Sequence, residues 1–216
     1  MRPFAHGWWR WRARRALALA RRATAEPGLG PRARSLLEAA IASGESTGCN
    51  DAPAFAACVE ELAVLTIRAG DLAASEGLIA RRVALGEAQG DRAAQLALAD
   101  FLYRVTLRLR AARQHALAEP HARRALALLE SAVPPADPRI EQALDTLASI
   151  ALRTGKLADA EQLLVRLLAI EERHGGGLAL ASTLNRLAQV ARSLGKHAEA
   201  SVIDERVAAL RDASRG

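Results

Sequence analysis

The side chains that most often carry out catalysis or bind metals are few and scattered in this sequence. Its five histidines are His6, His115, His121, His174 and His197. His115 and His121 are six residues apart, a spacing that directs two side chains to different faces of a helix. The sequence contains no His-Glu-x-x-His motif, which would place two zinc ligands and a general base together. We therefore expect no catalytic centre, no metal site, no cofactor and no enzymatic activity.

Three other groups of residues have structural explanations. The triple glycine at 175–177 follows a predicted helix and lacks the lysine of a phosphate-binding loop, so we interpret it as a hinge between repeats. Cys49 and Cys58 are too few for a disulfide framework and fit small thiols in a reducing compartment. The acidic pairs Glu60–Glu61 and Glu171–Glu172 are expected on solvated helix surfaces.

A pattern with a period of forty residues organises the chain. The spacing Leu-x-x-Leu-Ala-x-x-Ala-x-x-x-Gly-Lys-x-Ala-x-Ala occurs at 144–160 and again at 184–200. Apolar residues three and four apart form one stripe along a helix, and the glycine ends that helix in a left-handed conformation. Small residues such as Ala148 and Ala160 let two antiparallel helices approach closely. A single hairpin buries too little core, so hairpins must stack in series.

The repeated pattern resembles the tetratricopeptide repeat. Positions that the family fills with large and small residues are occupied by Leu144, Leu147, Ala148, Ala151, Ala160 and Leu164. The forty-residue period, the Pro-Pro-Ala-Asp-Pro loop at 134–138 and the Leu-Asn-Arg-Leu-Ala sequence at 184–188 resemble the kinesin-light-chain type. The resemblance implies an all-α fold, a right-handed solenoid of antiparallel helix hairpins whose first helices line an inner, concave surface.

We expect three parts along the chain. Residues 1–30 form a basic Trp/Arg-rich arm or helix, residues 31–53 a capping helix and loop, and residues 54–216 the solenoid. About four repeats are predicted, and the two helices before them fit a degenerate hairpin, since terminal repeats are often atypical. They lie at 54–89, 91–131, 138–174 and 178–211, and in the second of them Arg113 stands where the others have glycine.

Composition limits the class of protein. No run of about eighteen apolar residues is present, which argues against a membrane-spanning helix. The net charge of +6 belongs to the N-terminus, because residues 1–34 carry nine arginines and one glutamate. These arginines interrupt the place where a secretory signal would need an apolar region. The Ala-, Arg- and Leu-rich composition suggests a GC-rich bacterial genome, and we expect a cytoplasmic protein.

The Trp/Arg-rich segment has three interpretations. It is a helix that caps the end of the solenoid, an anchor for an anionic membrane surface, or a nucleic-acid contact in which indoles stack on bases. The residues that would meet an anionic partner are Trp8, Trp9, Arg10, Trp11, Arg12, Arg14 and Arg15.

The family resemblance also implies where a partner binds. Outward positions of the first helices are occupied by Glu60, Arg68, Tyr103, Arg110, Asp145, Ser149, Arg153, Asn185, Gln189 and Arg192, with Val64, Ile67 and Leu107 at equivalent places. The set lacks the regular Lys and Asn pairs that would clamp a C-terminal carboxylate. We expect a non-catalytic scaffold that binds a peptide or partner protein in its groove; the alternative is an adaptor anchored to a membrane or nucleic acid by its arm.

Overall fold

The computed structural model describes residues 2–49, 53–175 and 177–213. Across these ranges the chain is built from α-helices and one short 3-10 helix, with no strand. Gly176 of the predicted hinge and residues 50–52 of the predicted capping loop lie outside the described residues.

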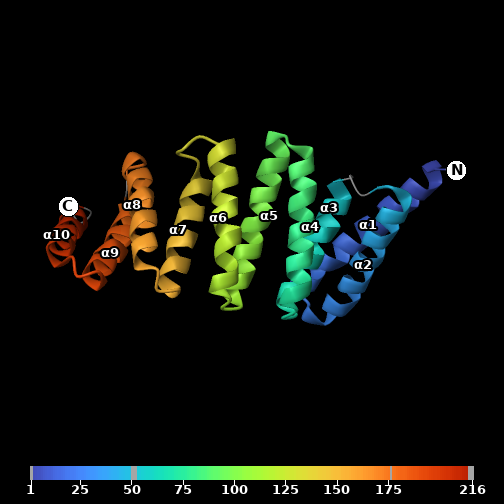
Figure 1. Cartoon of the computed structure of the whole chain (residues 1–216), viewed down its shortest axis with the longest axis horizontal. Helices are drawn as coiled ribbons and strands as arrows, with labels where there is room; N and C mark the ends of the chain where they lie inside the picture. The colour runs from blue at the N-terminus through green and yellow to red at the C-terminus, as the bar shows by residue number, and fades with distance from the viewer. Residues whose placement is uncertain (1, 50–52, 176, 214–216) are drawn as a thin grey trace. The chain divides into compact units, whose positions relative to one another are not determined.

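The helices form two compact units. Unit 1, Met1–Ala112, contains α1 (Arg2–Ala23), η1 (Pro27–Leu29), α2 (Gly30–Thr47), α3 (Pro53–Arg68), α4 (Leu72–Gln89) and α5 (Arg92–Ala111). Unit 2, Arg113–Gly216, contains α6 (His115–Ala132), α7 (Pro138–Arg153), α8 (Leu157–Arg173), α9 (Gly177–Ser193) and α10 (His197–Ala213). The predicted second repeat is thus shared, with its first helix in unit 1 and its second in unit 2. Within each unit, helices that follow one another in sequence are joined by short connections (Figure 1).

Unit 1 begins with a helix that belongs to its core. The inward stripe of α1 packs against α2 and α3, and its buried residues are Trp9, Ala13, Ala16, Ala20 and Ala23. Four of these five residues are alanine, which allows the close helix contact. The basic N-terminal segment is therefore a packed helix of unit 1 rather than a free arm.

Trp9 fills a space that Gly44 leaves open. The Trp9 side chain is 1% exposed, and its indole Nε1 donates a 2.9 Å hydrogen bond to the Ala40 carbonyl on α2. A Cβ on Gly44 would lie 2.7 Å from both Trp9 Nε1 and Phe55 Cδ2. Only glycine therefore admits both aromatic side chains at this crossing of α1, α2 and α3.

The turns that contain glycine inside three of the predicted hairpins share one geometry. Gly155 and Gly195 adopt φ values of 74° and 78°, as the predicted left-handed ends of α7 and α9 require. The amide of Lys156 donates to the Ala151 carbonyl at 2.9 Å, and that of Lys196 to the Ala191 carbonyl at 2.8 Å. In unit 1 Gly70 has φ 80°, and the backbone amide of Asp71 donates to the Thr66 carbonyl at 3.0 Å. Arg113, which replaces the glycine, is also left-handed, with φ 60°.

The residue after the turn glycine makes an ion pair with an earlier helix. In unit 2 this residue is the lysine of the repeated Gly-Lys motif, and in unit 1 it is Asp71, with the two charges exchanged. A hydrogen bond from Lys156 lowers the pKa of Glu119, which is nearly buried. The pairs are Arg34–Asp71 at 3.2 Å, Glu119–Lys156 at 2.9 Å and Glu161–Lys196 at 2.7 Å.

Candidate functional site

In unit 1 the helices α1, α3 and α5, which are the first helices of successive hairpins, border a groove of about 440 Å³. This groove lies where α3 packs beside both α1 and α5. We call it the unit 1 groove, and its lining residues are Arg21, Thr24, Glu61, Val64, Arg104, Leu107 and Arg108.

The unit 1 groove is cationic and has one prominent apolar side chain. Arg104 is held by Glu60 and Glu61 of α3. Arg21 and Arg108 form no ion pair with any residue in the described part of the chain. Leu107 is 41% exposed. Two guanidiniums without partners can bind carboxylates bidentately, and Leu107 can contact an apolar side chain beside them.

Glu60, predicted to contact a peptide, instead stabilises the unit. Its carboxylate accepts a 2.6 Å hydrogen bond from Nε of Arg82, whose side chain is only 5% exposed. The same guanidinium lies 5.9 Å from the Phe101 ring centroid. The expectation that Glu60 is a solvated surface residue is therefore wrong, because it neutralises a buried charge.

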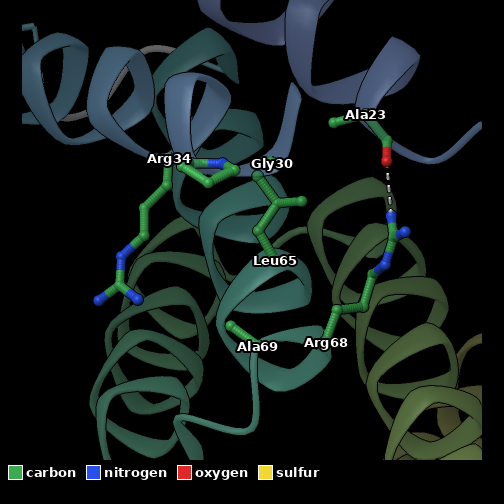
Figure 2. Close-up of a pocket in the computed structure, with 7 residues that line it drawn as sticks. Ala23, Gly30, Arg34, Leu65, Arg68 and Ala69 are labelled. Carbon is green, nitrogen blue, oxygen red and sulfur yellow. Dashed lines mark hydrogen bonds between the residues drawn. The ribbon is translucent and has the colours of Figure 1, made fainter. Parts of the chain in front are cut away.

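Arg68, also predicted to contact a peptide, supports α1. Its Nη1 donates a 3.0 Å hydrogen bond to the Ala23 carbonyl at the end of α1 (Figure 2). A cation at this place is favourable because the C-terminus of a helix carries partial negative charge. The surrounding pocket of about 340 Å³ includes Leu65 and Arg34. Since Arg34 is paired with Glu38 and Asp71, we assign this pocket no ligand.

The remaining unit 1 predictions lie around the groove rather than in it. Tyr103 and Arg110 are partly exposed on α5 and flank the groove residues. Of the equivalent apolar positions, Leu107 is exposed and lines the groove. Val64 lines it as well but is buried, and Ile67 is buried too, which corrects the expectation that both point outward.

In unit 2 several predicted contact residues are bound to other residues of the same unit. Arg186 on α9 forms an ion pair with Asp145 and donates a 3.2 Å hydrogen bond to Ser149, both on α7. Arg192 pairs with Asp204 at 2.6 Å. Asn185, whose amide was expected to bind a peptide backbone, donates to the Ala181 carbonyl of its own helix at 2.7 Å. Arg153 and Gln189 are exposed on the same two helices.

The Trp/Arg-rich residues divide into two sets. Trp9 cannot meet an external surface, which corrects its assignment to an anionic-surface arm. Trp8 and Trp11 are 59% and 54% exposed. Arg10, Arg14 and Arg15 are exposed, and Arg12 is partly exposed.

Glu171 of unit 2 is a buried carboxyl, although its sequence position suggests a solvated one. It is 6% exposed; Oε1 accepts a 3.0 Å hydrogen bond from Thr183, and Oε2 has no partner among the described atoms. Burial raises the pKa of Glu171, and the negative charges of Glu141 and Asp145 raise it further, against the opposing effects of Thr183 and Arg186. The ionised carboxylate is therefore disfavoured in the folded state.

This raised pKa predicts a pH dependence of stability. The folded state binds the Glu171 proton more tightly than the unfolded state, so the stabilisation is fully present below the unfolded pKa and is lost as pH rises through the folded pKa. Glu171→Gln should remove this contribution to the change of unfolding free energy with pH. Urea unfolding of wild type and variant at several pH values from acidic to neutral measures that change. Glu172→Gln, on the exposed neighbour, should keep the wild-type slope. Equal slopes for wild type and Glu171→Gln would contradict the assignment.

The described residues contain neither a metal site nor a membrane-spanning helix. Within the ranges that the structure describes, no cluster of three or more His, Cys, Asp and Glu side chains is arranged to hold a metal ion. None of the described helices is long and apolar enough to cross a membrane. Cys58 is buried, which raises its pKa to about 12 and makes it a poor nucleophile.

Comparison with known proteins agrees with this architecture. Residues 139–213, which span α7 to α10, match the family model of the tetratricopeptide repeat. No curated protein matches the sequence.

Solved structures extend the likeness to most of the chain. TPR-like repeats of a Podosopora anserina protein named as a kinesin light chain are 22% identical, with a TM-score of 0.65 over 94% of this chain and 96% of that one. BtubC (BKLC) from P. vanneervenii is 17% identical, with a TM-score of 0.56 over 94% of this chain and 90% of that one. A signal-transduction ATPase with a tetratricopeptide repeat sensor, from Pyrococcus horikoshii, is 17% identical, with a TM-score of 0.58 over 93% of this chain and 30% of that one. Residues 139–213 therefore match the tetratricopeptide repeat, and 94% of the chain has a fold similar to that of kinesin-light-chain-like repeats.

Proposed function

We propose that this protein is a non-catalytic scaffold that binds an extended, acidic segment of a partner protein in the unit 1 groove. Helical-repeat folds of this type generally serve as protein-binding surfaces. The observation that supports the proposal is the pair Arg21 and Arg108, two guanidiniums that have no carboxylate partner in the described part of the chain and that line the groove beside the exposed Leu107.

The chemistry of the groove defines the segment. Carboxylates bind guanidiniums through charge-assisted hydrogen bonds, which are stronger than those between neutral groups. An apolar side chain next to the carboxylates would cover Leu107, and an extended backbone keeps both within reach. All groove residues except Thr24, which directly follows α1, come from α1, α3 and α5, so the site is held mainly by helix packing rather than by a loop.

Peptide display on the full chain tests this function. We expect enrichment of peptides that place Asp or Glu beside an apolar residue. Arg21→Glu/Arg108→Glu should weaken the selected peptide's Kd at least about tenfold, measured by fluorescence anisotropy, because each lost charged hydrogen bond contributes about 1.5–3 kcal/mol.

A matched control separates the groove from net charge. Arg92→Glu/Arg173→Glu makes the same charge change at two exposed residues that do not line the groove, and it should leave the Kd within about twofold, since a charge that does not touch the peptide is screened by salt. A library without enriched acidic peptides would overturn the proposal, and so would equal losses in the two variants.

A further inference from the structure

The side of α1 that faces away from the core carries two exposed indoles among arginines. The guanidinium carbon of Arg12 lies 4.6 Å from the centroid of the Trp8 ring, and that of Arg15 lies 5.4 Å from the Trp11 ring. Exposed indoles are costly in water and typical of surfaces that meet a partner. We call this surface the Trp/Arg face; it consists of Trp8, Arg10, Trp11, Arg12, Arg14 and Arg15.

Packing fixes the direction of the Trp/Arg face. Trp9 lies between the two exposed tryptophans in sequence and is locked into the core by its hydrogen bond to Ala40. Because one helical residue rotates the side chain by about 100°, the buried stripe holds Trp8 and Trp11 toward solvent. The two indoles are thus held on a rigid helix.

The positive charge of this face is not compensated by ion pairs in the part of the chain that the structure describes. No acidic residue precedes Glu26, which pairs with Arg22. On the adjacent α2, Glu38 pairs with Arg34 and Glu45 pairs with Arg81. Among the described residues, the arginines of the Trp/Arg face therefore have no carboxylate partner.

We propose that the Trp/Arg face docks the protein onto an anionic lipid surface, with α1 lying parallel to it. Indoles settle at the level of the headgroups, and arginines bind the lipid phosphates. A nucleic-acid strand is less well matched, because strand binding uses a groove that follows the backbone and open aromatic faces. Here the face is a single helix, and a guanidinium already covers one side of each indole.

The lipid proposal is independent of the groove, since no residue of the Trp/Arg face lines it. Point variants are needed to test it, because removing residues 1–30 would also remove Trp9 and uncover Leu37 and Phe55, which belong to the same core.

Vesicle flotation of the full chain tests the proposal. We expect binding to phosphatidylcholine vesicles that contain phosphatidylserine and no binding to phosphatidylcholine alone. Trp8→Ala/Trp11→Ala and Arg14→Glu/Arg15→Glu should each lower the partition coefficient at least about tenfold. Arg92→Glu/Arg173→Glu is the control for charge and should leave binding within about twofold. Unchanged urea unfolding would show that the face variants remain folded.

Several outcomes would overturn this inference. They are the absence of vesicle binding, equal binding to neutral vesicles, and binding that survives loss of both exposed tryptophans. Tighter binding of a single-stranded oligonucleotide, with the same dependence on Trp8 and Trp11, would assign the face to nucleic acid instead. A blue shift of tryptophan emission upon addition of anionic vesicles, absent in Trp8→Phe/Trp11→Phe, would support lipid docking.

Discussion

Replacement of Trp9 by alanine should lower the free energy of unfolding by about 4 kcal/mol, the usual cost of removing a large buried aromatic side chain. The side chain is almost completely buried, and its loss also leaves the Ala40 carbonyl without its indole donor. Gly44 and Phe55 border the space, and neither can refill it without movement of a helix. Urea unfolding followed by circular dichroism measures the change.

The neighbouring Trp11 provides a matched control for Trp9. Trp11→Ala removes the same side chain from the exposed side of α1 and should change the free energy of unfolding by less than about 0.5 kcal/mol. If the two variants lost similar stability, the assignment of α1 to the core of unit 1 would be wrong.

Loss of Glu60 should be the second most damaging change, at about 3 kcal/mol, because it leaves a buried guanidinium without a counter-ion. Arg82 is more deeply buried than any other ion-paired arginine of the described chain, and Glu60 also holds Arg104. Glu60→Ala should therefore lower the midpoint of urea unfolding without changing the m-value, the dependence of the unfolding free energy on urea concentration.

Two further variants distinguish a structural Glu60 from a surface one. Glu61→Ala removes only a pair with the half-exposed Arg104 and should cost less than about 1 kcal/mol. Replacing both buried partners, as Glu60→Met/Arg82→Met, should recover most of the stability, because well-packed apolar residues can substitute for a buried ion pair. A Glu60→Ala variant as stable as Glu61→Ala would show that the pair does not stabilise unit 1.

The repeat pattern predicted the hairpins of the chain well. Leu144, Leu147 and Leu184 are buried, as the stripe requires, and the turn glycines adopt the expected left-handed conformation. These features are local: helical spacing determines the face, and only glycine adopts that conformation without strain. The ion pair that the lysine of the Gly-Lys motif forms with an earlier helix could not be predicted from the sequence, because it depends on how the helices stack.

The contact residues were harder to predict because α3 has no single exposed stripe. Every residue from Leu62 to Ile67 is buried, since α1, α2, α4 and α5 all pack against this helix. Periodicity is lost when a helix is covered on several sides, and a shift of one residue separates the structural Glu60 from the groove residue Glu61. For Trp9 a sequence signal did exist: its spacing to Ala13, Ala16 and Ala20 follows the helical period, whereas that of Trp8 and Trp11 does not.

Site-specific photo-crosslinking tests the central claim, peptide binding on the first helices of unit 1, most directly. A benzophenone amino acid placed at Leu107 should crosslink the display-selected acidic peptide, and the crosslink should disappear in Arg21→Glu/Arg108→Glu. The same probe at Val202, an exposed apolar residue on α10 of unit 2, should give none. Crosslinking at Val202 but not at Leu107, or at both with equal yield, would contradict a groove in unit 1 that binds the partner.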